Sequence, residues 1–364
     1  MEFSPFLAVD LGVLRANIER AQCWADARGL LLRPHAKTHK CVEIARLQTD
    51  AGASGLTVAT IGEAEVFADA GFADLFIAYP LWPSDAGRAR LARVASRAAV
   101  QIGVDSLEAA SGWAGVGVRA LIEVDSGHHR SGVLPEAAGE LAAAVEASGL
   151  KVDGVFTFPG HSYAPGEGRA RAGADEASAL ATAAEALRAA GVEPRVVSGG
   201  STPSLAGTGS GLTESRPGVY VFNDAQQWEL GSCATEDVAL TCHATVVSHA
   251  GGRLVLDAGS KVLGADRAAW ASGFGRLLDH PDARLVILSE HHAVAEAAVG
   301  HHHPLVYVGG VPARLQQRRD GHGQRARGPG HADHGRRHVH RETGQARRGE
   351  LPRQRRGAVR RPAP

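Results

Sequence analysis

The chain has 364 residues, of which 44% are hydrophobic and 21% charged, and its formal net charge at pH 7 is zero. This composition is typical of ordinary globular proteins, with room for one large domain and a smaller one. The N-terminal residues MEFSPFLAVDLGV lack the regions of a signal peptide, and no apolar run is long enough to span a membrane. Four cysteines without a C-x-x-C pair fit reduced thiols. We therefore expect a cytoplasmic protein that does not enter a membrane.

Short apolar runs alternate with longer segments of helical periodicity up to about residue 225. The predicted strands are residues 30–36, 56–61, 74–80, 100–106, 118–127, 152–162, 194–201 and 217–224. Nearly continuous apolar strands that alternate with helices indicate a parallel sheet covered by helices. Eight strands favour an α/β fold with a closed (β/α)8 barrel of the TIM type over residues 1–235, ahead of an open doubly wound sheet.

The first predicted strand runs into the cationic stretch LLRPHAKTHK, which holds two of the four lysines of the chain. Burial among other cations lowers the pKa of a lysine and makes its amine a nucleophile toward aldehydes, which is the chemistry of a Schiff base. Alternation along a strand places His35 and Lys37 on the same face. The alternative is that Lys37 and Lys40 are surface cations that follow a strand ending early.

A turn rich in small residues, SGGSTPS at 198–204, follows the seventh predicted strand. Such a turn offers backbone N–H groups to a phosphate, and barrels commonly bind phosphate after strands seven and eight. Many Gly-Gly-Ser turns are only loops. A nucleophilic lysine and a phosphate turn on one barrel rim nevertheless describe a site for pyridoxal 5'-phosphate.

Seven ordered segments between residues 5 and 292 carry a family resemblance. They are RPHAKTHK, ATIGEAEVFADAG, VDSGHHRSGV, GHSYAP, SGGSTPS, RPGVYVFND and LDAGSKVLGAD. Together they resemble the D-threonine aldolase and D-serine dehydratase family of fold type III pyridoxal phosphate enzymes, whose N-terminal barrel is like that of alanine racemase. The resemblance implies a lyase that acts on D-β-hydroxy amino acids, and a homodimer.

The resemblance also implies roles for individual residues of the rim. Lys37 matches the cofactor lysine, Lys40 a supporting residue, and Arg130 the arginine that faces the phenolic oxygen of the cofactor. The other matched cofactor-binding residues are Thr60, Tyr163, Gly200, Ser201, Thr202 and Tyr220. The candidate catalytic residues are Lys37, His35 and His161. For each of them, the alternative is a hydrogen-bonded polar group of an ordinary barrel.

Two reactions are open to such a site. Loss of the β-hydroxyl proton leads to cleavage into glycine and an aldehyde, as in an aldolase, which we take as the first hypothesis. Loss of the Cα proton and of hydroxide leads to a 2-oxo acid and ammonia, as in a dehydratase. Other readings are a racemase, for which no second base is assignable, and a pyridoxal phosphate-binding protein without turnover.

Residues 236–308 are predicted to form a smaller, incomplete β domain, because alternating strands replace the strand-helix pattern there. In the family this domain holds a divalent metal, zinc or manganese, through a His-x-Cys or His-x-Asp pair after an S-E-x-H block. The chain has LSEHHAVAE at 288–296 but no such pair beyond it. The metal is therefore expected from the resemblance while its ligands stay unassigned.

The end of the chain differs in composition from the rest. Residues 301–364 contain 15 Arg, no Lys and 4 Asp or Glu, a local charge of +11, and the segment 309–364 is rich in Arg, Gly, Pro and His. We hypothesise that a frameshift near residues 295–311 replaced the native end, which leaves the activity of the chain as written open. The alternative is a disordered basic arm that binds nucleic acid, which the absence of aromatic residues and of a folded motif disfavours.

Overall fold

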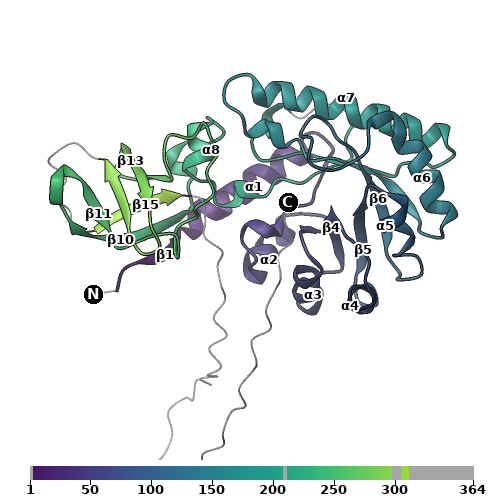
Figure 1. Cartoon of the computed structure of the whole chain (residues 1–364), viewed down its shortest axis with the longest axis horizontal. Coiled ribbons are helices and arrows are strands. Elements are labelled where there is room, and N and C mark those ends of the chain that lie inside the picture. The colour runs from purple at the N-terminus through teal and green to yellow at the C-terminus, as the bar shows by residue number, and fades with distance from the viewer. Residues whose placement is uncertain (1–2, 208–210, 297–304, 311–364) are drawn as a thin grey trace, which may run out of the picture. The chain divides into compact units, whose positions relative to one another are not determined.

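The computed structural model describes residues 3–207 and 211–296, together with the backbone of 305–310. Two sheets organise these residues, one of eight parallel strands and one of seven antiparallel strands (Figure 1). The tail predicted at 309–364 lies outside the described residues from 311 onward, as do the frameshift and the disorder hypothesised for it, whereas residues 309 and 310 end the last described strand. No described helix is long and apolar enough to cross a bilayer.

The parallel sheet is a closed barrel, as predicted. Its strands are β2 (Leu31–Leu32), β3 (Leu56–Val58), β4 (Asp74–Pro80), β5 (Ala99–Val104), β6 (Arg119–Glu123), β7 (Val152–Phe156), β8 (Val196–Gly199) and β9 (Glu214–Ser215). They pair in the order β2-β9-β8-β7-β6-β5-β4-β3. Two backbone hydrogen bonds, from Ser54 N to Leu32 O and from Thr57 N to Pro34 O, both 2.8 Å long, close the ring between β2 and β3.

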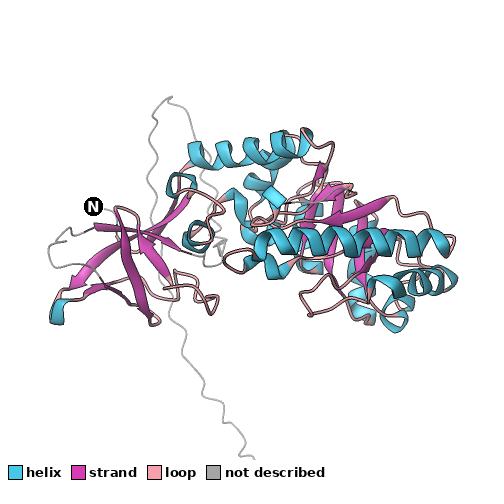
Figure 2. Ribbon diagram, turned by 90° about the horizontal axis from the view of Figure 1, so that it is seen from above, coloured by secondary structure: helices cyan, strands magenta, loops and turns pink. Residues whose placement is uncertain are grey.

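Helices cover the outside of the barrel strands (Figure 2). They are α1 (Leu11–Asp26), α2 (Val42–Asp50), α3 (Ile61–Asp69), α4 (Asp85–Ala95), α5 (Leu107–Ser111), α6 (Ala138–Ala147) and α7 (Gly168–Ala189). A further short helix, α8 (Ala225–Glu229), contacts strands of the antiparallel sheet. Side-chain caps fix several of the starts: the Asp10 carboxylate accepts from the N–H groups of Gly12 and Val13, and the Ser84 hydroxyl accepts from Gly87 N–H. The strand-helix alternation predicted from apolar periodicity is therefore confirmed.

The eighth barrel strand is not the predicted one. The strand is β9 at Glu214–Ser215, and the segment 217–224 instead contains a 3-10 helix, η5 (Val219–Val221). Tyr220, Val221 and Phe222 are consecutive buried residues in a cluster with α1, so their side chains do not alternate between two faces as those of a strand would. The segment is apolar, as the sequence indicates, but its consecutive buried residues do not have the alternation of a strand, so the prediction of a strand here is wrong.

Charged residues fill part of the barrel interior. Arg33 follows β2, and its guanidinium donates from Nε to Glu214 Oε2 at 2.8 Å and from Nη1 to Asp74 Oδ1 at 2.7 Å. Gly55 makes room for this ion-pair network, because a Cβ there would lie 2.6 Å from Arg33 Nη1. The network joins the starts of β4 and β9 to the end of β2, so electrostatic attraction supports the barrel where β2 contributes only two residues.

The antiparallel sheet forms the predicted smaller β domain. Its strands are β1 (Phe6–Val9), β10 (Leu240–Ser248), β11 (Leu254–Leu256), β12 (Gly275–Leu277), β13 (His280–Leu288), β14 (Ala293–Glu296) and β15 (Leu305–Gly310). They pair in the order β1-β10-β11-β14-β13-β12-β15, and β15 also pairs with β10, which closes the sheet on itself. The N-terminal strand β1 thus joins strands more than 230 residues away along the chain.

Candidate active site

Lys37 lies at the mouth of the barrel, in a 3-10 turn, η1 (Ala36–Thr38), that follows β2. Its Nζ lies 5.5 Å from the centre of the Phe158 ring, and the Arg130 Cζ lies 5.3 Å from the same centre. The Tyr163 ring is 6.3 Å from that of Phe158, centre to centre. One phenyl ring after β7 therefore brings together three residues that the sequence predicted for the site, from three separate segments.

The surroundings of Lys37 favour a neutral amine. Its side chain is exposed to the open mouth, yet protein surrounds it on most sides, and this burial lowers the pKa of the amine. The positive charges of Arg130 and Arg216 lower the pKa further, whereas Glu63 opposes the shift. The amine is thus a better nucleophile near neutral pH than an ordinary surface lysine.

His35 supports the turn that carries Lys37. Its ring Nδ1 accepts the Lys37 backbone N–H at 3.4 Å, and its own backbone N–H donates to Pro217 O at 2.9 Å. Burial and the charges of Lys37 and Arg216 hold the pKa of His35 well below its usual range. The imidazole is therefore neutral, which suits an acceptor beside a cationic cluster.

Lys40 and Thr60 belong to a neighbouring network rather than to the group around Phe158. Lys40 Nζ lies 2.7 Å from Glu63 Oε1, and Glu63 Oε2 accepts the Ala59 N–H at 2.7 Å. The exposed Thr60 hydroxyl caps α3 by accepting the Glu63 N–H at 3.1 Å. Lys40 is thus held by Glu63, and its supporting role toward a cofactor stays a prediction, as does the cofactor contact of Thr60.

A tight loop after β6 presents Arg130. The Asp125 carboxylate accepts from Gly127 N–H at 2.9 Å, from His129 N–H at 3.0 Å and from His129 Nδ1 at 2.7 Å. Burial raises the pKa of Asp125, but these hydrogen bonds outweigh it and the net shift is downward. The ionised carboxylate fixes the loop, and Arg130 is the next residue along it.

His161 pairs with a carboxylate from the following helix. Its Nε2 lies 3.2 Å from Asp175 Oδ2 on α7, and its buried Nδ1 has no hydrogen-bond partner among the described residues. When Nε2 donates to Asp175, Nδ1 is the bare acceptor nitrogen of the ring. Gly127 lies close by, since a Cβ there would be 3.4 Å from His161 Cε1.

The predicted phosphate turn follows β8, and hydroxyl groups hold it to neighbouring segments. Ser201 Oγ lies 2.8 Å from Ser162 Oγ in the G-H-S-Y segment, and Thr202 Oγ1 accepts the Tyr220 N–H at 3.0 Å. The Tyr220 side chain itself lies in the core, where its hydroxyl accepts from Gln48 Nε2 at 3.0 Å. The backbone of Tyr220, and not its phenol, therefore contacts the turn.

Gly200 has a conformation that a larger residue would strain. Its φ is +85°, and a Cβ would lie 2.2 Å from Ser215 Oγ. We expect Gly200→Ala to destabilise the protein by about 2 kcal/mol, from backbone strain plus the clash, and to weaken retention of pyridoxal phosphate. Urea unfolding and equilibrium dialysis measure the two effects.

Gly191 provides the matched control. Its φ is +81°, but no atom lies within 4 Å of the position of a Cβ. Gly191→Ala should carry only the backbone cost, about 1 kcal/mol, and leave cofactor retention unchanged. Equal losses in both variants would contradict the contribution of the close packing around Gly200.

Glu176 of α7 lies directly under the turn. It is fully buried, and its Oε1 accepts the Gly200 N–H at 2.6 Å. Burial raises the pKa of this carboxyl to about 7, against the opposing effects of the Gly200 N–H and of Arg216. A carboxyl whose pKa is higher in the folded than in the unfolded protein stabilises the fold fully only at low pH.

This shift predicts a pH-dependent stability for the protein without cofactor. Between pH 5 and pH 8 the free energy of unfolding should fall by about 2.5 kcal/mol, because the unfolded state releases the Glu176 proton at lower pH than the native state, and the fall should level off above pH 7. Glu176→Gln should remove that loss. Urea unfolding of both proteins at the two pH values measures it. The exposed Glu185→Gln on the same helix is the control, and a Glu176→Gln effect independent of pH would refute the assignment.

The described residues fit pyridoxal phosphate. Buried polar atoms without hydrogen-bond partners surround the mouth, namely Glu123 Oε2, His161 Nδ1 and Ser215 Oγ. Ser215 Oγ borders the position that a Cβ on Gly200 would fill, so a polar group beside this turn would meet a free hydroxyl. The same test fails for a metal, because the described residues contain no group of three His, Cys, Asp or Glu side chains placed to hold one.

Two important residues were missed in the sequence. Phe158 lies within a predicted strand segment, where an aromatic residue looks like ordinary core. Glu176 occupies the apolar stripe of α7, whose buried positions are Ala172, Gly173, Glu176, Ala179, Leu180, Ala183, Ala184 and Leu187. A carboxyl at that spacing is the signal that could have identified it.

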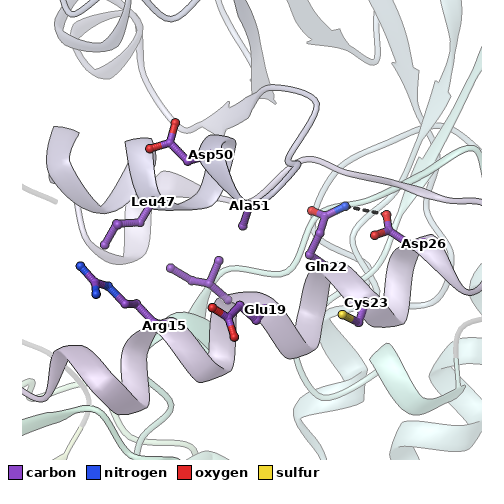
Figure 3. A pocket seen from close by; sticks show the side chains of 9 residues that line it. Arg15, Glu19, Gln22, Cys23, Asp26, Leu47, Asp50 and Ala51 are labelled. Atoms are coloured by element: carbon purple, nitrogen blue, oxygen red, sulfur yellow. Dashed lines mark hydrogen bonds between the residues drawn. The ribbon is translucent and has the colours of Figure 1, made fainter.

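A cavity of about 440 Å³ between α1 and α2 offers an alternative site (Figure 3). Its lining residues are Arg15, Ile18, Glu19, Gln22, Cys23, Asp26, Leu47, Asp50 and Ala51. It combines one arginine with three carboxylates, and it shares no residue with the mouth around Lys37. The residues predicted for the site gather instead at the barrel mouth, around Phe158.

Comparisons with known proteins agree with this architecture. Residues 9–226 match the family model of the N-terminal domain of alanine racemase, and residues 239–311 match that of a serine dehydratase domain. The chain is 38% identical to D-threo-3-hydroxyaspartate dehydratase of Delftia sp. strain HT23, over 76% of this chain and 77% of that enzyme. It is 33% identical to D-threonine aldolase of Arthrobacter sp., over 82% and 81% of the two chains.

Solved structures extend the comparison to three dimensions. The Delftia dehydratase superposes with a TM-score of 0.78 at 32% identity, covering 86% of this chain and 91% of that one. Another structure of the same enzyme is a cysteine-to-alanine mutant in the metal-free form. The similarity thus includes both the barrel and the antiparallel sheet.

Proposed function

The chain belongs to the family of D-threonine aldolase and D-threo-3-hydroxyaspartate dehydratase, with its alanine racemase-like barrel, and we propose from this premise that it is a pyridoxal phosphate-dependent lyase acting on D-β-hydroxy amino acids. The observation that carries the proposal is the Lys37 amine at the barrel mouth, over Phe158 and beside Arg130. Retro-aldol cleavage to glycine and an aldehyde is the first form of the reaction, and elimination to a 2-oxo acid and ammonia is the second.

Lys37 is the proposed attachment residue and the group that holds or accepts the Cα proton. Burial and the nearby arginines lower the pKa of its amine, which increases the share of the neutral, nucleophilic form. Arg130, presented by the loop that Asp125 orders, would face the phenolic oxygen of the cofactor. Gly200, Ser201 and Thr202 would hold the phosphate, and when bound the cofactor would supply an electron sink for the bond broken at Cα.

His161 is the proposed group for the β-hydroxyl proton. Asp175 orients its ring through Nε2, which leaves the bare Nδ1 to accept a proton. Tyr163 remains a hydrogen-bond donor, because burial raises the pKa of its phenol. The neutral His35 and the capping residue Thr60 support the rim rather than the proton transfers.

The products of D-threonine decide between the two reactions. Incubation with the cofactor-loaded protein should release glycine and acetaldehyde in equal amounts, whereas elimination would release 2-oxobutanoate and ammonia. L-Threonine is the matched control and should give neither pair. Absence of both cleavage and elimination products from D-threonine, D-serine and D-threo-3-hydroxyaspartate would refute the proposed lyase.

The metal remains a prediction for this chain. We propose that a divalent cation, zinc or manganese, assists the reaction, which the metal-free form named for a mutant of the Delftia enzyme supports. No step is assigned to it, because the described residues do not supply its ligands. The assays above, repeated with added Mn²⁺, Zn²⁺ or EDTA, test the requirement.

The frameshift, the homodimer and the cytoplasmic location are likewise proposals. The serine dehydratase match ends at residue 311, near the point where the composition changes, and this supports a replaced end. Resequencing the gene tests the frameshift. If no other reading frame encodes a better C-terminal end, the frameshift hypothesis is wrong. Light scattering of the purified protein tests the dimer.

A further inference from the structure

Glu176 is a buried carboxyl that the proposed reaction does not use. It comes from α7, on the outside of the barrel, yet it is fully buried and its Oε1 accepts the Gly200 N–H at 2.6 Å. Its Oε2 has no hydrogen-bond partner among the described residues. A buried carboxylate oxygen without a partner is costly, whereas a protonated carboxyl is much less so.

The turn is built around this carboxyl. A Cβ on Gly199 would lie 2.4 Å from Glu176 Oε1, so the glycine gives the carboxyl its space. The Gly200 N–H points at Glu176, although in an unobstructed turn it would be available to a bound anion. The carboxyl therefore holds the backbone of the turn in place and also brings a potential negative charge to an anion site.

Among the described residues, one positive charge acts on Glu176 and so reduces the repulsion between its carboxylate and a bound anion. Arg216, which follows β9, is the charged group that acts on Glu176, and it is itself shared with Glu214 and Glu123. Glu214 is also paired with Arg33, but no second cation acts on Glu176 among the described residues. A phosphate dianion bound on the turn adds further negative charge to the same surroundings, so it favours the neutral form of Glu176.

We propose that Glu176 is the positioning residue of the phosphate turn, and that binding of the cofactor phosphate is coupled to uptake of a proton by its side chain. The inference rests on the proposed pyridoxal phosphate site and adds a linkage between occupancy and pH. Below neutral pH the carboxyl is already protonated and binding needs no proton. Above neutral pH the carboxyl is ionised, so binding of the cofactor phosphate must be accompanied by uptake of a proton. The affinity for the cofactor therefore falls as pH rises.

Titration of the cofactor-free protein with pyridoxal phosphate between pH 6 and pH 8.5 tests the inference. The ratio of Kd values, wild type over Glu176→Gln, should be constant at low pH and then rise above pH 7, by up to about tenfold per pH unit. Pyridoxal, which lacks the phosphate, should give a flat ratio with the same two proteins. Calorimetry in two buffers of different ionisation enthalpy should detect more proton uptake in the wild type.

The possible results distinguish the proton coupling at Glu176 from the proposed pyridoxal phosphate site on which it rests. Failure of every variant to bind pyridoxal phosphate overturns both the inference and the proposed function. Binding with a flat ratio, or with a pyridoxal ratio that changes in the same way, overturns the proton coupling alone. Glu176→Met, which lacks both the charge and the acceptor, should bind pyridoxal phosphate more weakly than Glu176→Gln at every pH, because the turn then loses the contact that positions its backbone. Binding as tight as that of Glu176→Gln would overturn the positioning role.

Discussion

Lys37→Ala should abolish the borohydride-reducible adduct with pyridoxal phosphate and, with it, all turnover. The reason is positional, because among the described residues the Lys37 amine alone combines a lowered pKa with a place beside Phe158 and Arg130. The measurement is the absorbance at about 420 nm before and after borohydride, followed by mass mapping of the labelled peptide. Wild type should lose the band and gain a stable label on Lys37.

Lys40→Met is the matched control for this experiment. Lys40 lies three residues further along the chain, but its Nζ is paired with Glu63 Oε1 at 2.7 Å. The variant should keep the adduct, with its absorbance band unchanged in position. If the label moved to Lys40, or if Lys37→Ala kept a reducible band, the assignment of the cofactor lysine would be wrong.

Arg33→Met should destabilise the protein by about 3 kcal/mol, because it leaves a buried carboxylate without its partner. The side chains of Arg33 and Glu214 are only 6% and 2% exposed. The value lies at the low end for such losses, since Asp74 is 42% exposed and Arg216 remains near Glu214. Urea unfolding of the purified variants measures the change.

Two further variants separate burial from charge. Arg97→Met breaks the Arg97–Asp69 pair, in which both side chains are exposed, and should cost less than about 1 kcal/mol. The double variant Arg33→Met with Glu214→Gln should recover part of the loss, because the fully buried carboxylate is then neutral and only the partly exposed Asp74 lacks its partner. Similar losses at the buried and exposed pairs would contradict this account of barrel closure.

Local pattern predicted much of the site because barrel chemistry gathers where strands end. An apolar run precedes Lys37, the loop at Arg130 and the turn at Gly200. Each of these positions can therefore be recognised from a short stretch of sequence. The segment 217–224 was misassigned, because its apolar residues face one helix rather than two sides of a sheet. Short apolar runs do not distinguish these cases.

By itself, the sequence determined the barrel, the smaller β domain and the chemical character of the rim, since apolar periodicity and turn residues act over a few positions. Only the tertiary structure decided which of these groups meet. Phe158 joins Lys37 to Arg130, and Glu176 reaches Gly200 from the next helix, through contacts between residues 24 to 121 positions apart. Such contacts depend on how strands and helices pack, and a burial that shifts the pKa of Lys37 or Glu176 exists only once that packing is complete.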